Sequence, residues 1–370
     1  MSFLKMRLDQ VCLIRRGSTI TKNQVKAGNI PVVAGGKTST ISHNEANRDA
    51  NTITVSASGA SAGYVNFWQV PIFASDCSTV EVINELADIN YVYYFLKFKQ
   101  DYLYSLQAGA AQPHVYAKDI AKIEISLPPL EQQRRIASIL DQAGKLRQKR
   151  QQTIEKLDQL LQATFIDMFG DPIDNLKGLE TVALLDLCKK VTDGTHQSPK
   201  WTTEGIPFLF ISNIVDGEID YSSQKFIDQV TYDSLTKSTK IELNDILYTT
   251  VGSYGNVARV KSDQLFCFQR HIAHIKPNFD KVNPEFLEKM LSSYGVKRQA
   301  DRLVRGVAQK TLNLKDLKEI IVFNISLDEQ NHFVQKCEAI ESLKIKSKLA
   351  LNQADDLFKS LQNQAFNGTL

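Results

Sequence analysis

The side chains in this sequence that could do chemistry are hydrogen-bonding groups on short turns. Arg, Lys, Asn and Gln can form paired hydrogen bonds with base edges, and Ser, Thr and Tyr can contact bases or phosphates. In the first half of the chain the candidates are Arg15, Arg16, Ser18, Thr19, Lys22, Gly35, Gly36, Lys37, Thr38, Ser58, Ser61 and Tyr64. In the second half they are Lys189, Lys190, Thr192, Thr195, His196, Lys200, Asn213, Ser253, Tyr254, Asn256 and Arg259. The alternative for each one is an ordinary solvated loop residue.

Two basic runs lie in stretches that are rich in good helix formers. "KLRQKR" contains Lys145, Arg147, Lys149 and Arg150, and "KIKSK" contains Lys344, Lys346 and Lys348. These charges could contact phosphates, bind an acidic partner surface, or form a solvated helix face. A phosphate role predicts that neutralising them weakens binding to every sequence and flattens its salt dependence.

The sequence contains no motif for autonomous catalysis. It has no GxxxxGK[ST] phosphate loop. It also lacks the Asn-Pro-Pro or Asp-Pro-Pro motif followed by an aromatic residue that amino-methyltransferases use, because Asp171-Pro172 is followed by Ile173 and is typical of a helix end. His271 and His274 lie three apart in a candidate strand, so they point to opposite faces, and we expect no metal site and no cofactor. Five scattered cysteines are interpreted as buried thiols: Cys12, Cys77, Cys188, Cys267 and Cys337.

The chain contains an internal repeat that must position these groups. Residues 109–133, "GAAQPHVYAKDIAKIEISLPPLEQQ", align without a gap with residues 306–330, "GVAQKTLNLKDLKEIIVFNISLDEQ", at an offset of 197. The offset is nearer 177 early in each half, so the second globular part carries about twenty additional residues. We expect the segment around Gln112 and His114 to be a structural hinge. A duplicated chain suits a two-part target, of which duplex DNA is the commonest.

The repeated tails are predicted to be long helices. After Pro128-Pro129, residues 131–168 are rich in Gln, Leu, Lys, Arg and Ala, with apolar or small residues at 4-3 spacing. The second tail repeats this seam, and both seams turn polar midway. Such a seam requires a partner helix, and about 35 residues form a rod of roughly 50 Å. Strands are expected at 51–58, 70–83, 245–253 and 265–276, and helices at 89–106 and 283–303.

The bulk properties are those of an ordinary globular protein. A length of 370 residues allows two or three domains, and the net charge of +3 neither identifies nor excludes a nucleic-acid partner. No apolar run approaches the length of a membrane span, and no secretory signal is evident. We therefore expect a soluble protein of the cytoplasm, with no membrane partner.

Two features together resemble one family. One is a sheet-rich module that ends in "LPPLEQQRRIASILD" (127–141) before a long Gln/Lys/Arg helix, and the other is the repetition of this arrangement up to "AFNGTL" (365–370). The chain resembles the specificity (S) subunit of type I restriction-modification systems. The resemblance implies an α+β fold with two globular α/β target recognition domains. These would be related by pseudo-two-fold symmetry and joined by two long antiparallel helices that form a coiled-coil spacer. The implied segments are a first recognition domain (1–127), a central spacer helix (128–170), a second recognition domain (171–324) and a C-terminal spacer helix (325–370).

The resemblance also implies a function. Each domain would read one half of a bipartite double-stranded DNA site, and two methyltransferase subunits, with or without translocase-nuclease subunits, would dock on the chain. The chain itself would be non-catalytic. Because the first domain starts almost at Met1, the C-terminal tail would close the assembly alone. The alternatives are a two-headed DNA-binding or architectural protein without catalytic partners, and a free-standing restriction or modification enzyme with diverged motifs.

Overall fold

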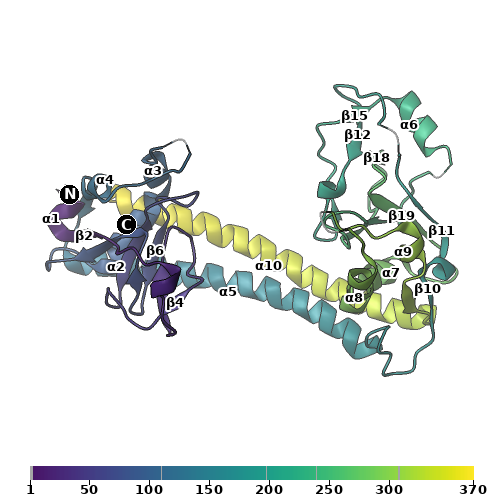
Figure 1. Ribbon diagram of the computed structural model, residues 1–370, viewed down its shortest axis with the longest axis horizontal. Helices are drawn as coiled ribbons and strands as arrows, with labels where there is room; N and C mark the ends of the chain where they lie inside the picture. Colours follow the sequence, from purple (N-terminus) through teal and green to yellow (C-terminus); the bar gives the residue numbers. More distant parts are fainter. Residues whose placement is uncertain (1–2, 110, 197, 239, 307–308) are drawn as a thin grey trace. The chain divides into compact units, whose positions relative to one another are not determined.

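The computed structural model describes residues 3–109, 111–196, 198–238, 240–306 and 309–370, and they divide into two units. The first unit consists of residues 1–152 together with 348–370, and the second consists of residues 153–347. Each unit therefore contains one globular module and helical segments from both halves of the repeat (Figure 1).

The first globular module is a mixture of short strands and helices. Its elements are β1 (Leu4–Arg7), α1 (Leu8–Val11), β2 (Cys12–Arg16), η1 (Lys22–Gln24), β3 (Ile30–Val33), β4 (Ser42–His43), β5 (Thr52–Ser56), β6 (Val65–Trp68), β7 (Phe73–Ala74), β8 (Cys77–Val82), α2 (Ile89–Phe98), α3 (Gln100–Ser105), α4 (Ala117–Ala121) and β9 (Glu124–Leu127). The strands form three sheets, in the orders β2-β8-β5-β6, β4-β3-β7 and β1-β9. The central strand β5 is buried on both faces, as its run of β-branched residues favours.

The second globular module repeats this arrangement. Its elements are β10 (Thr181–Ala183), η2 (Leu184–Leu187), β11 (Cys188–Asp193), β12 (Ile206–Leu209), η3 (Ile211–Asn213), β13 (Ile214–Val215), β14 (Glu218–Ile219), β15 (Phe226–Ile227), α6 (Gln229–Thr236), β16 (Ile246–Thr249), β17 (Val257–Arg259), β18 (Cys267–Phe268), β19 (Ile272–Pro277), α7 (Pro284–Leu291), α8 (Tyr294–Leu303), α9 (Leu314–Lys318) and β20 (Ile321–Phe323). Each of its sheets β11-β19-β16-β17, β15-β12-β18 and β10-β20 corresponds to a sheet of the first module. The additional elements are the β13–β14 hairpin and α6, so they hold the extra residues that the drift in offset predicted. The predicted α+β fold and its duplication are confirmed.

The two long helices are α5 (Leu130–Phe169) and α10 (Leu327–Asn367). In the first unit the start of α5 lies antiparallel to the end of α10, with Ile136, Leu140 and Ala365 buried in one core. In the second unit the end of α5 lies antiparallel to the start of α10, and Phe165 packs edge-on against Phe333 at 5.6 Å between ring centroids. The predicted helices and their apolar seams are confirmed.

A buried glutamine fixes each globular module to its own helix. In the first unit the Gln133 Oε1 accepts a hydrogen bond from the backbone of Asp88 (2.9 Å), and its Nε2 donates to the carbonyls of Leu86 and Pro128 (2.7 and 2.8 Å). Gln330 makes the same three contacts in the second unit, with Asn283, Lys281 and Ile325.

The described ends of the repeated Gly-x-x-Gln segment have the same backbone geometry in both units. Gly109 and Gly306 have φ values of +101° and +96°, and a Cβ on either would approach the carbonyl of Gln112 or Gln309 to 2.9 or 2.5 Å. Only glycine suits such a position. The turn is closed by paired backbone bonds, at 2.9 Å between Ala108 and His114 in the first unit. The interpretation of this segment as a structural hinge agrees with these backbone contacts.

Candidate nucleic-acid interface

The first unit gathers two of the predicted loops at one end of the β5–β6 hairpin. Gly35 packs so closely on the turn that a Cβ there would lie 2.5 Å from the carbonyl oxygen of Ser58. The Ser58 hydroxyl in turn donates to Asp76. The Lys37 ammonium lies 5.4 Å from the ring centroid of Tyr64. Lys37 and Thr38 are exposed and Ser61 and Tyr64 are half-buried, so the two loops present one polar surface.

The remaining first-half candidates follow β2. Arg15 donates two hydrogen bonds to Glu81 (2.7 and 2.6 Å), yet its side chain is still 43% exposed. Ser18 is held by a backbone bond to Ala74 (2.9 Å), while Arg16, Thr19 and Lys22 are exposed. This group lies near the first loop cluster, because both contact the segment 74–77. The N–H of Gly17 donates to the carbonyl of Cys77, and Gly35 lies beside the Asp76 carboxylate.

The second unit builds an equivalent surface at the end of the β16–β17 hairpin. Tyr254 donates to Asp301 (2.7 Å), and this bond to a carboxylate raises the pKa of the phenol. The Lys297 ammonium lies over the Tyr254 ring at 3.7 Å. Ser253 is exposed at the tip of the turn, and the backbone N–H of Asn256 donates to Thr249. A lysine–tyrosine contact therefore recurs in the same hairpin of both units.

A second group of candidates in this unit lines a cavity of about 260 Å³ beside β11. Thr192, Thr195 and His196 line it, with buried His274 at its wall. His196 pairs with Asp193 (2.9 Å), and the Lys190 ammonium donates to the carbonyl of Ser238 (2.9 Å). Lys189 lies 5.5 Å from the ring of Phe279, and Lys200 is exposed in the following loop.

Two of the predicted residues serve internal structure. Asn213 is only 8% exposed, and its carboxamide bonds to the backbone of Phe210, Asp220 and Ser222 (2.9, 2.8 and 2.7 Å). Arg259 is 18% exposed and is held by Glu285 (2.9 Å) and Glu288 (3.3 Å). Both therefore hold loops and helices together in this structure.

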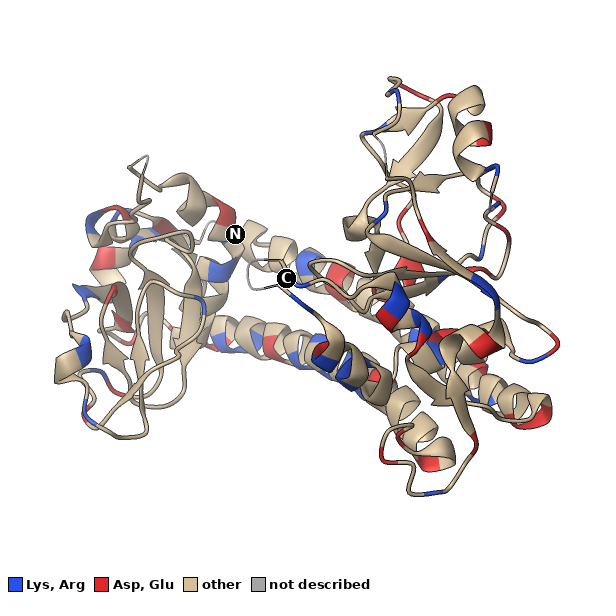
Figure 2. Cartoon of the chain, turned by 45° about the vertical axis from the view of Figure 1, so that its right-hand side comes forward, with Lys and Arg blue, Asp and Glu red and all other residues tan. Residues whose placement is uncertain are grey.

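The predicted basic residues of the helices fall into three classes. Arg147 pairs with Asp355 in the first unit, and Lys344 pairs with Asp158 in the second, so both act between the helices. Lys145 pairs with Asp141 on its own helix at 2.6 Å. Lys149, Arg150, Lys346 and Lys348 are exposed. Basic and acidic residues both occur along the two helices (Figure 2).

Sequence reasoning missed two pairs of residues beside these surfaces. Gln112 and Gln309 are exposed on the repeated turn, which bonds to the candidate hairpin through Gly59 in the first unit and Gly252 in the second. The repeat itself was the signal that could have identified them. Lys97 was also missed; it lies 4.6 Å from the Tyr64 ring, and burial together with nearby Lys37 lowers its pKa. In the second unit Lys297, on a different helix (α8), makes the corresponding contact with Tyr254.

Within the described ranges, no three His, Cys, Asp or Glu side chains are grouped so as to hold a metal ion. None of the helices in that portion of the chain is long and apolar enough to cross a membrane.

The comparisons with known proteins all point to one family. The family model described as "Type I restriction modification DNA specificity domain" matches residues 3–156 and 177–353. The chain is 28% identical over 302 residues to the EcoBI specificity subunit of Escherichia coli, covering 73% of this chain and 64% of that protein. It is 23% identical over 339 residues to the MjaVIII specificity subunit of Methanocaldococcus jannaschii, covering 86% and 79%. The chain thus spans less than two thirds of the E. coli relative.

Two solved structures share the fold. One is the S subunit of a type I restriction-modification system from M. genitalium, with a TM-score of 0.60, 18% identity and coverage of 98% and 96% of the two chains. The other comes from work on complex assembly and conformational transition of the type I system, with a TM-score of 0.61, 18% identity and coverage of 100% and 98%. Both matches extend over nearly the whole chain.

Proposed function

This chain belongs to the family of type I restriction-modification DNA specificity domains, and on that premise we propose that it is the DNA-specificity subunit of such a system. Each of its two modules reads one half of a bipartite duplex site. The chain is not itself an enzyme. Two methyltransferase subunits assemble on it, joined by translocase-nuclease subunits in a complete restriction complex, and it works in the cytoplasm. The family relationship of both modules carries this proposal.

The proposed division of labour follows the repeat. Residues 1–127 and 171–324 are the two recognition domains, and residues 128–170 and 325–370 are the spacer helices. The element boundaries are compatible with this division, because β9 ends at Leu127 and α5 begins at Leu130.

The proposed DNA contacts are the exposed and half-buried polar groups on the hairpin ends and their neighbouring loops. In the first domain these are Arg15, Arg16, Ser18, Thr19, Lys22, Lys37, Thr38, Ser61, Tyr64 and Gln112. In the second they are Lys189, Lys190, Thr192, Thr195, His196, Lys200, Ser253, Tyr254, Asn256 and Gln309. Gln112 and Gln309 are the strongest members, because each is an exposed carboxamide on a glycine turn that recurs at the same place. A glutamine can make paired hydrogen bonds with adenine.

A genome-wide map of methylated bases tests the function directly. Deleting this gene should abolish methylation at one motif that has two short specified blocks around a fixed unspecified gap. Purified chain should show no methyl transfer and no cleavage without its partners. An unchanged methylation map, with DNA binding retained, would favour a two-headed DNA-binding protein and would contradict the proposal.

Single substitutions test the assignment of one domain to each block. We expect Gln112→Ala to relax or weaken recognition of one block, and Gln309→Ala that of the other, by about 10- to 100-fold in affinity, because each removes base contacts worth roughly 1–3 kcal/mol. The readout is binding of duplexes that carry single-block changes. Gln142→Ala, an exposed glutamine on α5, is the matched control and should bind like the parent protein.

A further inference from the structure

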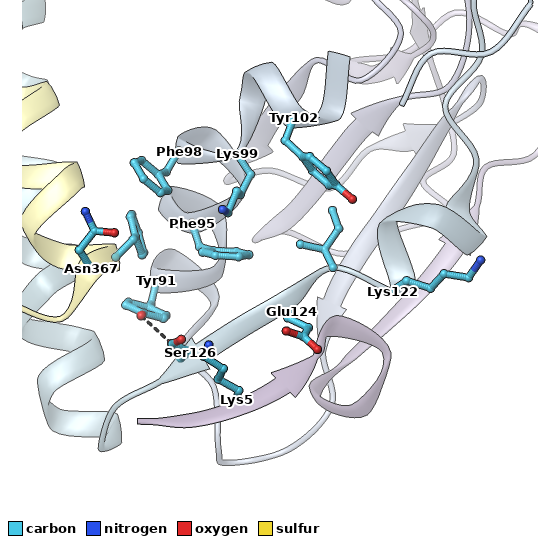
Figure 3. Close-up of a pocket in the computed structure, with 12 residues that line it drawn as sticks. Lys5, Tyr91, Phe95, Phe98, Lys99, Tyr102, Lys122, Glu124, Ser126 and Asn367 are labelled. Atoms are coloured by element: carbon cyan, nitrogen blue, oxygen red, sulfur yellow. Dashed lines mark hydrogen bonds between the residues drawn. The ribbon is translucent and has the colours of Figure 1, made fainter. Parts of the chain in front are cut away.

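The first unit contains a pocket of about 430 Å³ that the proposed DNA-reading surface does not include (Figure 3). Its floor is aromatic, formed by Phe95 and Phe98 of α2 and by Phe366 near the end of α10. Phe98 stacks on Phe366 with 5.1 Å between the ring centroids. Strand β9 forms the opposite wall, with Glu124 and Ser126 facing the pocket.

The backbone of β9 presents an open edge to this pocket. In an antiparallel pair, every second residue of a strand bonds to the neighbouring strand. The N–H of Leu8 donates to the carbonyl of Ile123, so every second residue of β9, counted from Ile123, bonds to β1. Glu124 and Ser126 therefore turn their N–H and C=O groups away from β1. The hydroxyl of Tyr91 confirms this direction, because it donates to the Ser126 carbonyl at 2.8 Å (Figure 3).

The second unit closes the corresponding edge with its own side chain. There Gln299 of α8 pairs with Ile321 of β20, accepting from its N–H at 2.9 Å and donating to its carbonyl at 2.8 Å. This carboxamide imitates a neighbouring strand. The offset of 197 places Tyr102 where Gln299 stands and Glu124 where Ile321 stands. Leu103 and its counterpart Ala300 are both fully buried, which supports this register.

Tyr102 has no amide with which to imitate a strand. It is 50% exposed on α3, which has six residues where α8 has ten. The edge of β9 at Glu124 is therefore left facing a pocket, and an exposed strand edge is a template for pairing with another chain.

We propose that this pocket is a docking site for an extended, acidic peptide segment of a protein partner. One peptide residue pairs its N–H and C=O with Glu124, and a neighbouring apolar side chain packs on Phe95 and Phe98. The charge of the pocket favours an acidic peptide, because it is lined by three lysines and a single acid. These are Lys5, Lys99, Lys122 and Glu124. Lys122 lies at the rim beside Asp119 (3.6 Å), so Lys5 and Lys99 are the residues that face an acidic side chain.

A peptide fits this pocket better than a DNA backbone does. A phosphate can accept hydrogen bonds from lysine, but it has no N–H to donate to the Glu124 carbonyl. The proposal therefore commits to a protein partner and makes DNA an outcome of the test.

The test measures fluorescence anisotropy of a labelled decapeptide of alternating Glu and Val, added to the full-length protein. We expect saturable binding to the parent chain. Tyr102→Gln should weaken it at least tenfold, because the new carboxamide can close the edge as Gln299 does. Lys99→Glu should weaken it at least tenfold through charge. Tyr116→Gln and Lys118→Glu, which change exposed residues outside the pocket, are the matched controls and should bind like the parent.

Four results would overturn the proposal, three of them with peptides and one with duplex DNA. One is the absence of saturable binding, and another is equal binding of an alternating Lys-Val peptide. The third is equal binding of a Glu-Val peptide whose central amides are N-methylated, since these cannot pair with a strand edge. If a duplex displaces the peptide, and Lys99→Glu weakens binding of that duplex equally, the pocket belongs to DNA and the proposal fails. A thermal unfolding midpoint like the parent's establishes that each variant is folded.

Discussion

At the scale of single residues, Gln133 and Gln330 show how a polar side chain can be buried without penalty. Each is at most 1% exposed, and each uses its oxygen and both amide hydrogens in hydrogen bonds to the backbone. A buried carboxamide that satisfies three backbone groups is costly to replace, because its partners then stay unpaired away from water.

Replacing either glutamine by leucine should therefore destabilise the protein. We expect Gln133→Leu and Gln330→Leu each to lower the free energy of unfolding by about 2–4 kcal/mol, because up to three buried groups lose their partners. Urea unfolding followed by circular dichroism measures this change. Gln148→Leu, at an exposed site on α5, should change it by less than about 0.5 kcal/mol. Equal effects of all three substitutions would contradict the role of the buried carboxamides.

A buried carboxylate makes the second unit sensitive to acid. Burial alone would raise the pKa of Asp245, but hydrogen bonds from His274 (2.6 Å) and Lys276 (2.8 Å) outweigh it and hold that pKa below its usual value. A lowered pKa in the folded state contributes stability above the unfolded value of about 3.9, and this stability is lost as the pH falls through the folded value. Asp245→Asn should reduce stability at pH 7 by about 3 kcal/mol and remove this component of the acid dependence. Unfolding curves at pH 7 and at about pH 3 measure both effects, and an unchanged difference between the two pH values would contradict the account.

The roles of some candidate residues could be predicted from the sequence, and those of others could not. Turn residues such as Lys37 and Tyr64 were identifiable from composition alone, and the structure brings them together. The internal roles of Asn213 and Arg259 were not predictable, because Arg259 meets Glu285 and Glu288 only through the packing of α7 on β17. A contact between residues far apart in the sequence can be predicted only when the fold is known.

At the scale of elements, the two long helices carry matched ion pairs. Arg147 of α5 pairs with Asp355 of α10 in the first unit. At the offset of 197 these positions correspond to Lys344 and Asp158, which pair in the second unit. The sequence showed that the apolar seams turn polar midway, but it could not show which acid meets which base. The short strands β4, β7 and β18 were similarly hard to predict, because two residues give no periodicity.

The Arg147–Asp355 pair should be measurable as a coupling. Both side chains are more than 30% exposed, so solvent screens the pair and we expect a coupling of about 0.5–1 kcal/mol. The single variants Arg147→Ala and Asp355→Ala and the double variant complete the thermodynamic cycle. Arg147→Ala should cost more than Asp355→Ala, because the guanidinium also lies 4.6 Å from the ring of Phe358. Additive effects of the two substitutions would show that the pair contributes nothing.

At the scale of the whole molecule, the proposed spacer role makes a geometric prediction. Removing one heptad from the middle of each long helix keeps the seam in register and shortens the rod by about 10 Å, at 1.5 Å per residue. The unspecified gap of the recognised site should then shorten by about three base pairs, at 3.4 Å per step. Selection of bound duplexes from a library with variable gaps reads out this change. An unchanged gap would contradict the spacer role.

The distribution of the helices between the units has a consequence for synthesis. Ala365 and Phe366, at the end of the chain, pack in the core of the first unit, whereas Phe165 and Phe169 of the first repeat pack in the second. The first module therefore leaves the ribosome without the final segment of its core. Nearly 200 residues are translated before that segment is made, which takes about 10–40 s at 5–20 residues per second. During this interval we expect the nascent first module to expose the rings of Phe95 and Phe98, which contact Phe366 in the folded protein.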